Sequence, residues 1–292
     1  MPQPRVSKLI DRPFAIFALV LCAIFTSSLV RAEAANKTPR VVTSIAPIHA
    51  LASAVMEGVG APYLLVPPGV NAHGYALRPS DARALANADV VFWLGAGLER
   101  FLDKPLKGGG RRALSVRLSA YVAGLPVREG GVWGNHDEHT DSGGHKIDPH
   151  VWLDPENAKR MAAEIAKRLS AFDSENSSVY ESNATALAVS IDQAARDVEN
   201  VLAPVKTIPY VVFHDAYQYF ESRFDMNAVG SIMINPERPP GAARISDVRR
   251  KIRETGAACV FHEPQFKPKL VETVIRGGAA KSAPLDPIGV GI

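Results

Sequence analysis

One long helix-forming segment near the middle of the chain constrains the fold more than any other feature. From Ser174 to Leu202 the sequence contains neither glycine nor proline, and alanine and acidic residues are frequent. Its apolar residues recur at helical spacing, and Pro204 ends the pattern because proline cannot continue a helix. The segment therefore predicts a single long helix that connects the two flanking parts of the chain rigidly.

On both sides of this segment, short apolar runs alternate with stretches of helical periodicity. Such alternation predicts parallel strands whose faces are covered by helices. The runs expected to form strands are residues 41–45, 63–66, 89–94, 210–213, 257–261 and a segment near 283–285. The stretches expected to form helices are 47–56, 79–88 with Ser80 as its N-cap, a short helix after 95–97, 155–169, 244–254 and 269–275. The predicted fold class is α/β, with two lobes of mainly parallel sheets joined by one long connecting helix.

The predicted domain boundaries follow from the same pattern. A first α/β lobe is expected over residues 35–172, the connecting helix over 173–203 and a second α/β lobe over 204–292. Within the first lobe, residues from about 130 to 146 are rich in glycine, histidine and acidic residues and lack periodic apolar positions. This composition predicts a loop.

Residues 1–34 have the pattern of a cleavable secretory signal. A basic start is followed by an apolar stretch over residues 14–30 and by the small-residue pattern Ala32-Glu33-Ala34. A membrane anchor is the alternative. However, the stretch is short for a span of ~20 apolar residues, and it is interrupted by hydroxyl residues at 26–28. The sequence therefore predicts export, with a mature chain that begins at Ala35.

The charge of the chain argues against some classes of binding partner, and its cysteines are few. The formal net charge is +3, and the leader holds four basic and two acidic residues, which leaves the mature chain close to neutral. No dense basic patch is present, so no nucleic-acid partner is indicated, and nothing indicates a lipid substrate. Cys22 lies in the leader. Cys259 lies in an apolar run typical of a buried strand, where it is expected to act as a small hydrophobic residue, with a thiolate metal ligand as the alternative.

Histidines carry the clearest chemical signal. The chain has eight, and six of them lie in three distinctive single-histidine settings and one short tract. The settings are Asn-Ala-His-Gly-Tyr around His73, Asp-Pro-His-Val-Trp-Leu around His150 and Val-Phe-His-Asp-Ala-Tyr around His214, and the tract runs from residue 136 to 145. Imidazole is a common zinc ligand, and a His/Asp/Glu tract is typical of metal handling. A single strand-end histidine is more often structural, but three in corresponding places predict a transition-metal site, with zinc as the metal.

Several of these side chains follow strands of the predicted sheets. His214 comes directly after the strand 210–213, Glu263 and Asp286 follow later strands, and His73 lies in a loop after the strand 63–66. Ligands of parallel α/β sheets bind beyond the carboxyl ends of the strands. We therefore expect a metal site in the cleft between the lobes. The remaining histidines, His49 and His262, are expected to lie outside that site.

Longer segments of the chain resemble one known family. The chain is similar to the periplasmic zinc-binding protein of the high-affinity zinc ABC importer, within the wider zinc/manganese solute-binding group. The resembling segments are 42–47, 73–81, 150–155, 213–220, 235–237, 259–266 and 285–289, in order along nearly the whole mature chain. The resemblance implies two α/β lobes with zinc in the cleft between them. It also implies a periplasmic, non-enzymatic, monomeric receptor that delivers zinc to an ABC transporter permease with its ATPase.

The resemblance also implies a ligand set. His73, His150 and His214 correspond to the zinc ligands of the family, and Asp148, Asp154 and Asp215 are close enough in sequence to orient the imidazoles. Some relatives have a glutamate immediately before the first histidine, where this chain has Ala72. Water, Asp286 or a loop histidine are the candidates for the fourth ligand. The loop histidines, which are expected to form an accessory collector, are His136, His139 and His145.

Two further comparisons with the family pattern concern the metal and the end of the chain, and only the second is a departure from it. Manganese-binding relatives tend to have glutamate in place of the third histidine, whereas this chain has His214, which favours zinc. Relatives continue into a final helix, which often carries a cysteine paired with the equivalent of Cys259. The second lobe is accordingly expected to be truncated at Ile292, with Cys259 left without its partner.

Two other functions fit part of the pattern. Three histidines and an open position also describe a zinc-dependent hydrolase, in which Glu263 would be the general base, although no H-E-x-x-H motif is present. A metal-dependent adhesin is the third class, which only the predicted export supports. We expect a zinc receptor without enzymatic activity.

Overall fold

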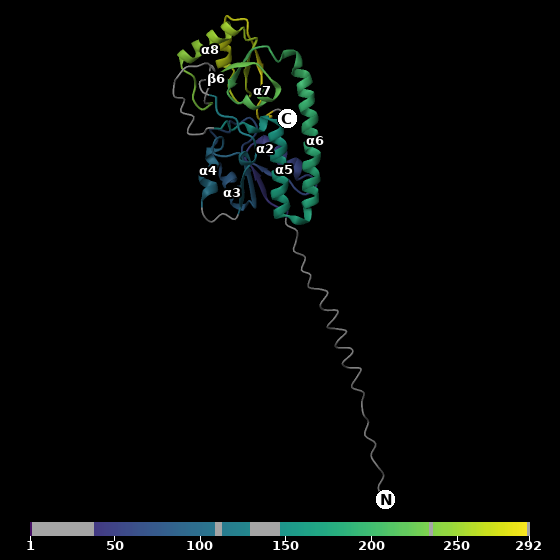
Figure 1. The fold of residues 1–292 in the computed structure, drawn as a ribbon. Coiled ribbons are helices and arrows are strands. Elements are labelled where there is room, and N and C mark those ends of the chain that lie inside the picture. The colour runs from purple at the N-terminus through teal and green to yellow at the C-terminus, as the bar shows by residue number, and fades with distance from the viewer. Residues whose placement is uncertain (2–37, 109–112, 129–146, 234–235, 291–292) are drawn as a thin grey trace. The chain divides into compact units, whose positions relative to one another are not determined.

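Two four-stranded sheets, each made only of parallel strand pairs, form the framework of the chain (Figure 1). The computed structural model describes residues 1, 38–108, 113–128, 147–233 and 236–290. The first sheet has the order β2-β1-β3-β4, from β1 (Val41–Thr43), β2 (Tyr63–Leu64), β3 (Val90–Trp93) and β4 (Leu114–Arg117). The second has the order β6-β5-β7-β8, from β5 (Tyr210–His214), β6 (Ala228–Met233), β7 (Cys259–His262) and β8 (Lys281–Pro284). Both lobes therefore repeat one topology, in which the first strand lies between the second and the third.

Helices connect the strands in each lobe. The first lobe contains α2 (Ala46–Val55), α3 (Pro79–Asn87), α4 (Arg100–Lys107) and α5 (Pro155–Phe172), with 3-10 turns at Leu118–Tyr121 and Val151–Leu153. The second contains α7 (Gln218–Phe224), α8 (Ala242–Thr255) and α9 (Lys269–Ile275). None of the helices in the described ranges is both long enough and apolar enough to span a bilayer.

The central strands are covered on both faces. In β3, Val90 and Phe92 pack into one apolar cluster, whereas Val91 and Trp93 pack into another. In β5, Val211 and Phe213 pack on one side, and Tyr210 and Val212 on the other. Successive side chains of a strand point to opposite faces, so apolar residues at every position require helices on both sides of the sheet. This burial holds the carboxyl ends of the strands in place.

The long helix joins the two lobes as predicted. α6 (Ser177–Leu202) follows a 3-10 turn at Ser174–Asn176 and leads into another at Ala203–Val205, close to the expected range 173–203. Tyr180 is fully buried against the first lobe, and its hydroxyl donates to Asp173 at 2.8 Å. Nδ2 of Asn183 donates to the carbonyl oxygens of Val55 and Glu57, which anchors α6 at the end of α2. These contacts attach the helix firmly to the first lobe.

Other elements differ from the sequence prediction. Ser80 is not the N-cap of α3; the helix starts at Pro79 after Arg78, because the fixed φ of proline suits the first helical position. The strands β4 and β6 and the helix α7 were not predicted. β6 contains Gly230 and Ser231, which have low strand propensity, and it forms an edge of its sheet. All of the predicted leader except Met1, and the whole predicted loop at 130–146, lie outside the described residues.

Candidate metal centre

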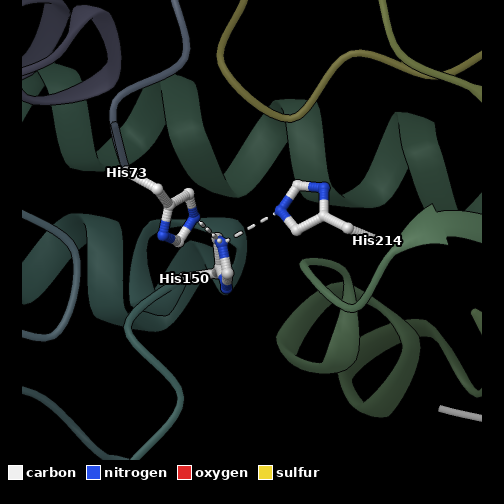
Figure 2. Close-up of side chains that lie close together, drawn as sticks. All are labelled: His73, His150 and His214. Carbon is white, nitrogen blue, oxygen red and sulfur yellow. Dashed lines mark hydrogen bonds between the residues drawn. The ribbon is translucent and has the colours of Figure 1, made fainter. Parts of the chain in front are cut away.

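Three imidazole rings from distant parts of the sequence converge on one point (Figure 2). Nε2 of His150 lies 3.4 Å from Nε2 of His73 and 3.4 Å from Nε2 of His214. The three ring nitrogens all lie within 4.8 Å of one another, and among the described residues this is the group that could hold a metal ion. The spacing suits three ligands around one ion.

The fold brings each histidine to this point from a different element. His214 is the last residue of β5, at the carboxyl end of the strand. His150 directly precedes the 3-10 turn at Val151–Leu153, and His73 lies in the loop between β2 and α3. Two of the imidazoles therefore come from the first lobe and one from the second. The indole N–H of Trp152 donates to the carbonyl oxygen of Pro287 at 2.7 Å and ties the lobes together beside the site.

Two of the three imidazoles are oriented by carboxylates. Nδ1 of His150 lies 2.7 Å from Oδ1 of Asp148, and Nδ1 of His214 lies 2.6 Å from Oε1 of Glu263. A carboxylate only accepts hydrogen bonds, so the proton of each neutral ring resides on Nδ1 and the lone pair on Nε2. Both rings thus present the nitrogen that can bind a metal, in an orientation fixed by their partners.

His73 is held differently. Its backbone N–H donates to Oδ1 of Asn71 at 3.0 Å, but no acceptor for its Nδ1 is found in the part of the chain that the structure describes. Its loop is fixed at the other end by Tyr75, whose hydroxyl donates to the fully buried Asp81 at 2.6 Å. The backbone N–H of Arg78 donates to the same carboxylate at 2.8 Å. The backbone of the loop, not a partner on the ring, positions this imidazole.

The surroundings shift the pKa values of His73 and His214 in opposite directions. Burial lowers the pKa of His73 well below its usual range, and the positive charges that His150, His214 and Arg100 carry when protonated lower it further. Burial also lowers the pKa of His214, but the negative charge of Glu263 and its hydrogen bond outweigh this effect, so the net shift is upward. Glu263 therefore supports a positive charge on or beside this ring.

The histidines line a pocket whose wall is largely apolar. Residues from both lobes form that wall, including Ile45, Leu98, Trp152, Phe266 and Ile288. Apolar walls exclude competing polar groups and strengthen the electrostatic interactions of a bound ion. Ala72, in the position where some relatives carry glutamate, also lines the pocket and is buried.

The carboxylates that the sequence singled out have separate roles. Asp148 orients an imidazole, as expected. Asp154 does not; it caps α5 by accepting from the N–H of Glu156 and pairs with Arg223 of α7. Asp215 also does not; its carboxylate pairs with Arg128. The orienting group for His214 is Glu263, 49 residues away, a contact that the spacing in the sequence does not reveal.

The remaining candidates lie apart from the three imidazoles. Asp286 is not in the group of potential ligands; it accepts from the backbone N–H groups of Ile288, Gly289 and Val290. His49 contacts Thr43, and His262 contacts Ser282. Cys259 is a half-buried free cysteine that packs in the second lobe. The loop residues His136, His139 and His145 lie outside the described residues.

This arrangement has the chemistry of a zinc site. Three neutral imidazole nitrogens with one further position match the four-coordinate preference of Zn²⁺. Imidazole suits zinc better than manganese, which favours oxygen ligands.

Comparison with known proteins agrees with this chemistry. A family model described as "Zinc-uptake complex component A periplasmic" matches residues 41–291. The high-affinity zinc uptake system protein ZnuA of Brucella abortus (strain 2308) is 43% identical over an alignment 304 positions long, which covers 94% of this chain and 91% of that protein.

Solved structures share the fold. A crystal structure of ZnuA has a TM-score of 0.74 at 23% identity and covers 86% of this chain and 92% of its own. The laminin-binding protein Lmb of Streptococcus agalactiae, described as a bifunctional protein with adhesin and metal transporting activity, has a TM-score of 0.74 at 22% identity, over 86% of this chain and 90% of its own. The identity to the Brucella relative and the extent of the family match together settle the classification: the chain belongs to the periplasmic component A family of zinc-uptake complexes, whose members bind zinc.

Proposed function

We propose that this protein is the zinc receptor of an ABC import system and that His73, His150 and His214 are its zinc ligands. It captures zinc in the periplasm and hands it to a membrane permease driven by an ATPase. The observation that carries the assignment is the convergence of three imidazole nitrogens within 4.8 Å of one another, two of them on rings oriented by carboxylates. The protein acts as a monomer and catalyses no reaction.

Export completes this role. The proposed mature chain starts at Ala35, after a cleavable leader over residues 1–34. The domains proposed for the mature chain are a first lobe over 35–172, a connecting helix over 173–203 and a second lobe from 204. Mass-spectrometric determination of the N-terminus of protein taken from the periplasm tests the leader; an intact N-terminus at Met1 would contradict cleavage.

The contacts of Glu263 weigh against a zinc hydrolase. A general base must be free to take a proton from the water bound to the metal. The carboxylate of Glu263 instead lies 2.6 Å from Nδ1 of His214 and is buried with an exposure of 1%. Adhesion is not proposed, because the likeness to the laminin-binding protein extends to the fold alone.

Titration with zinc tests the ligand assignment. We expect one tight site per chain, and each single His→Ala substitution at positions 73, 150 and 214 should weaken binding by orders of magnitude. His49→Ala is the matched control, because this half-buried histidine contacts Thr43 outside the group of three. Wild-type affinity in His214→Ala would overturn the assignment.

The histidine tract is proposed to collect zinc for the main site. His136, His139 and His145 would bind zinc weakly, since the tract has no apolar residues to form a core around the ion. Deleting residues 136–145 should lower the zinc stoichiometry or the capture of scarce zinc while the tight site remains. Loss of all tight binding in the deletion variant would instead identify a loop histidine as the fourth ligand.

A further inference from the structure

One residue that lines the histidine pocket has a buried side-chain oxygen without a hydrogen-bond partner. In the described part of the chain, four buried side-chain oxygens have no partner: Ser44 Oγ, Gln218 Oε1, Glu221 Oε1 and Gln265 Oε1. Of these four residues, Gln265 is the one that lines the pocket of the three histidines. A buried polar atom without a partner costs free energy, so an unpaired oxygen in a binding pocket indicates a group that pairs when the pocket is filled.

Asp286 determines which end of the Gln265 amide is unpaired. Nε2 of Gln265 donates to Oδ1 of Asp286 at 3.1 Å. A carboxylate accepts and does not donate, so the NH₂ group must face Asp286 and the carbonyl oxygen must be the free atom. Asp286 is itself held by the backbone N–H groups of residues 288–290. The contact with Asp286 therefore holds the Gln265 amide so that its buried carbonyl oxygen is the unpaired atom.

The zinc site needs such an acceptor. Three imidazoles leave one position of a tetrahedral zinc ion open. The described carboxylates do not join the group of three, and Ala72 supplies no ligand atom. A water in the open position becomes a stronger hydrogen-bond donor because the ion polarises it. Much of the surrounding wall is apolar, with Ile45, Leu98 and Phe266 among its residues, and these offer no acceptor.

We propose that Gln265 belongs to the zinc site and accepts a hydrogen bond from the water that completes the coordination of zinc. This inference rests on the proposed function. It assigns Asp286 the task of orienting Gln265. A neutral amide fits the proposed receptor, because an amide carbonyl stabilises the bound water but is too weak a base to take its proton.

The test compares two glutamines that each have a buried side-chain oxygen without a hydrogen-bond partner. Gln265→Met replaces the amide by an unbranched side chain of similar length that has only a weak acceptor. Gln218→Met is the matched control, because Gln218 also has a buried unpartnered Oε1 but does not line the pocket. Zinc affinity is measured by competition with a chelator, and the absorption spectrum of the Co²⁺-loaded protein reports the coordination of the metal. Thermal unfolding of the metal-free proteins reports effects on the fold.

For Gln265→Met we expect one zinc per chain, an affinity lower by roughly tenfold, as for the loss of one hydrogen bond to a polarised donor, and an altered Co²⁺ spectrum. Gln218→Met should have the zinc affinity and the Co²⁺ spectrum of the wild-type protein. Wild-type affinity and spectrum in Gln265→Met, or the same changes in both variants, would overturn the inference and leave the zinc receptor in place. Wild-type affinity in His214→Ala would overturn the proposed function instead.

Discussion

The carboxylate of Glu263 accepts the Nδ1 proton of His214 at 2.6 Å, across 49 residues of sequence. Glu263 follows β7 and His214 ends β5, and these two strands are neighbours in the second sheet. Their pairing places an orienting carboxylate beside the proposed zinc ligand, and both residues are buried. The sheet itself therefore determines the orientation of this imidazole.

Replacing Glu263 should weaken zinc binding without removing a ligand. In Glu263→Gln the charge that supports His214 beside a cation is lost, and we expect affinity to fall by about 10- to 100-fold. Competition titration with a chelator measures this. Asp154→Asn is the control, since Asp154 is close to His150 in sequence but contacts Glu156 and Arg223 instead of an imidazole. Equal losses in the two variants would contradict a specific role for Glu263.

The hydroxyl of Tyr75 should position the first ligand. Tyr75 lies two residues after His73, and its hydroxyl donates to Asp81 at 2.6 Å. The hydroxyl of Tyr63 in β2 donates to the same carboxylate at 3.1 Å. The bonds of Asp81 offset its burial and lower its pKa to about 2, so each tyrosine donates to a charged acceptor. Tyr75→Phe should release zinc roughly tenfold faster, as for the loss of one such bond, and Tyr63→Phe should release it at the wild-type rate. Stopped-flow transfer of zinc to a chelator compares the two, and identical rates would exclude this role.

Arg128 should hold the two lobes together. It precedes residues 129–146 in the first lobe and pairs with Asp215 and with Glu221 of α7 in the second. Its side chain is 23% exposed, and breaking a largely buried pair leaves uncompensated charge, so Arg128→Met should lower the free energy of unfolding by about 3 kcal/mol. Arg223→Met removes the more exposed pair with Asp154, for which we expect less than about 1 kcal/mol. Urea unfolding of the metal-free proteins measures both losses. Similar losses in free energy of unfolding would show that burial does not determine how much each ion pair stabilises the protein.

Glu99 should make stability depend on pH. This fully buried carboxyl accepts from the N–H groups of Leu94 and Gly95, but burial outweighs these bonds and raises its pKa from 4.5 to about 7. The folded state therefore binds the proton more tightly than the unfolded state. Its contribution is fully present below about pH 4.5 and is lost as the pH rises through about 7.

The matching glutamine variant isolates this effect. Glu99→Gln mimics the protonated form and does not titrate. Relative to this variant, the wild-type protein should lose stability on the order of 3 kcal/mol as the pH rises across that window. Urea unfolding of both proteins at the two ends of the window measures the change. A stability difference that is constant with pH would show that Glu99 is already charged in the folded protein.

The architecture was predictable from the sequence because it depends on local patterns. Apolar runs such as 89–94 and the helical spacing of 174–202 indicate their elements directly, and both are present as β3 and α6. Where local preference was weak, prediction failed. The strand β6, with Gly230 and Ser231, forms because it pairs with β5, and that pairing is a property of the fold.

The sequence alone also identified the three histidines, since each lies in a distinctive setting and His214 ends an apolar strand. Only the tertiary structure decided what orients them. Asp148 is two residues from His150 and was within reach of sequence reasoning, but Glu263 and Gln265 reach the site through the pairing of β5 with β7. Asp154 and Asp215 are also close to a histidine in sequence, yet each contacts an arginine instead of an imidazole. Proximity along the chain limits where a side chain can be, but packing and strand register determine which atoms it contacts.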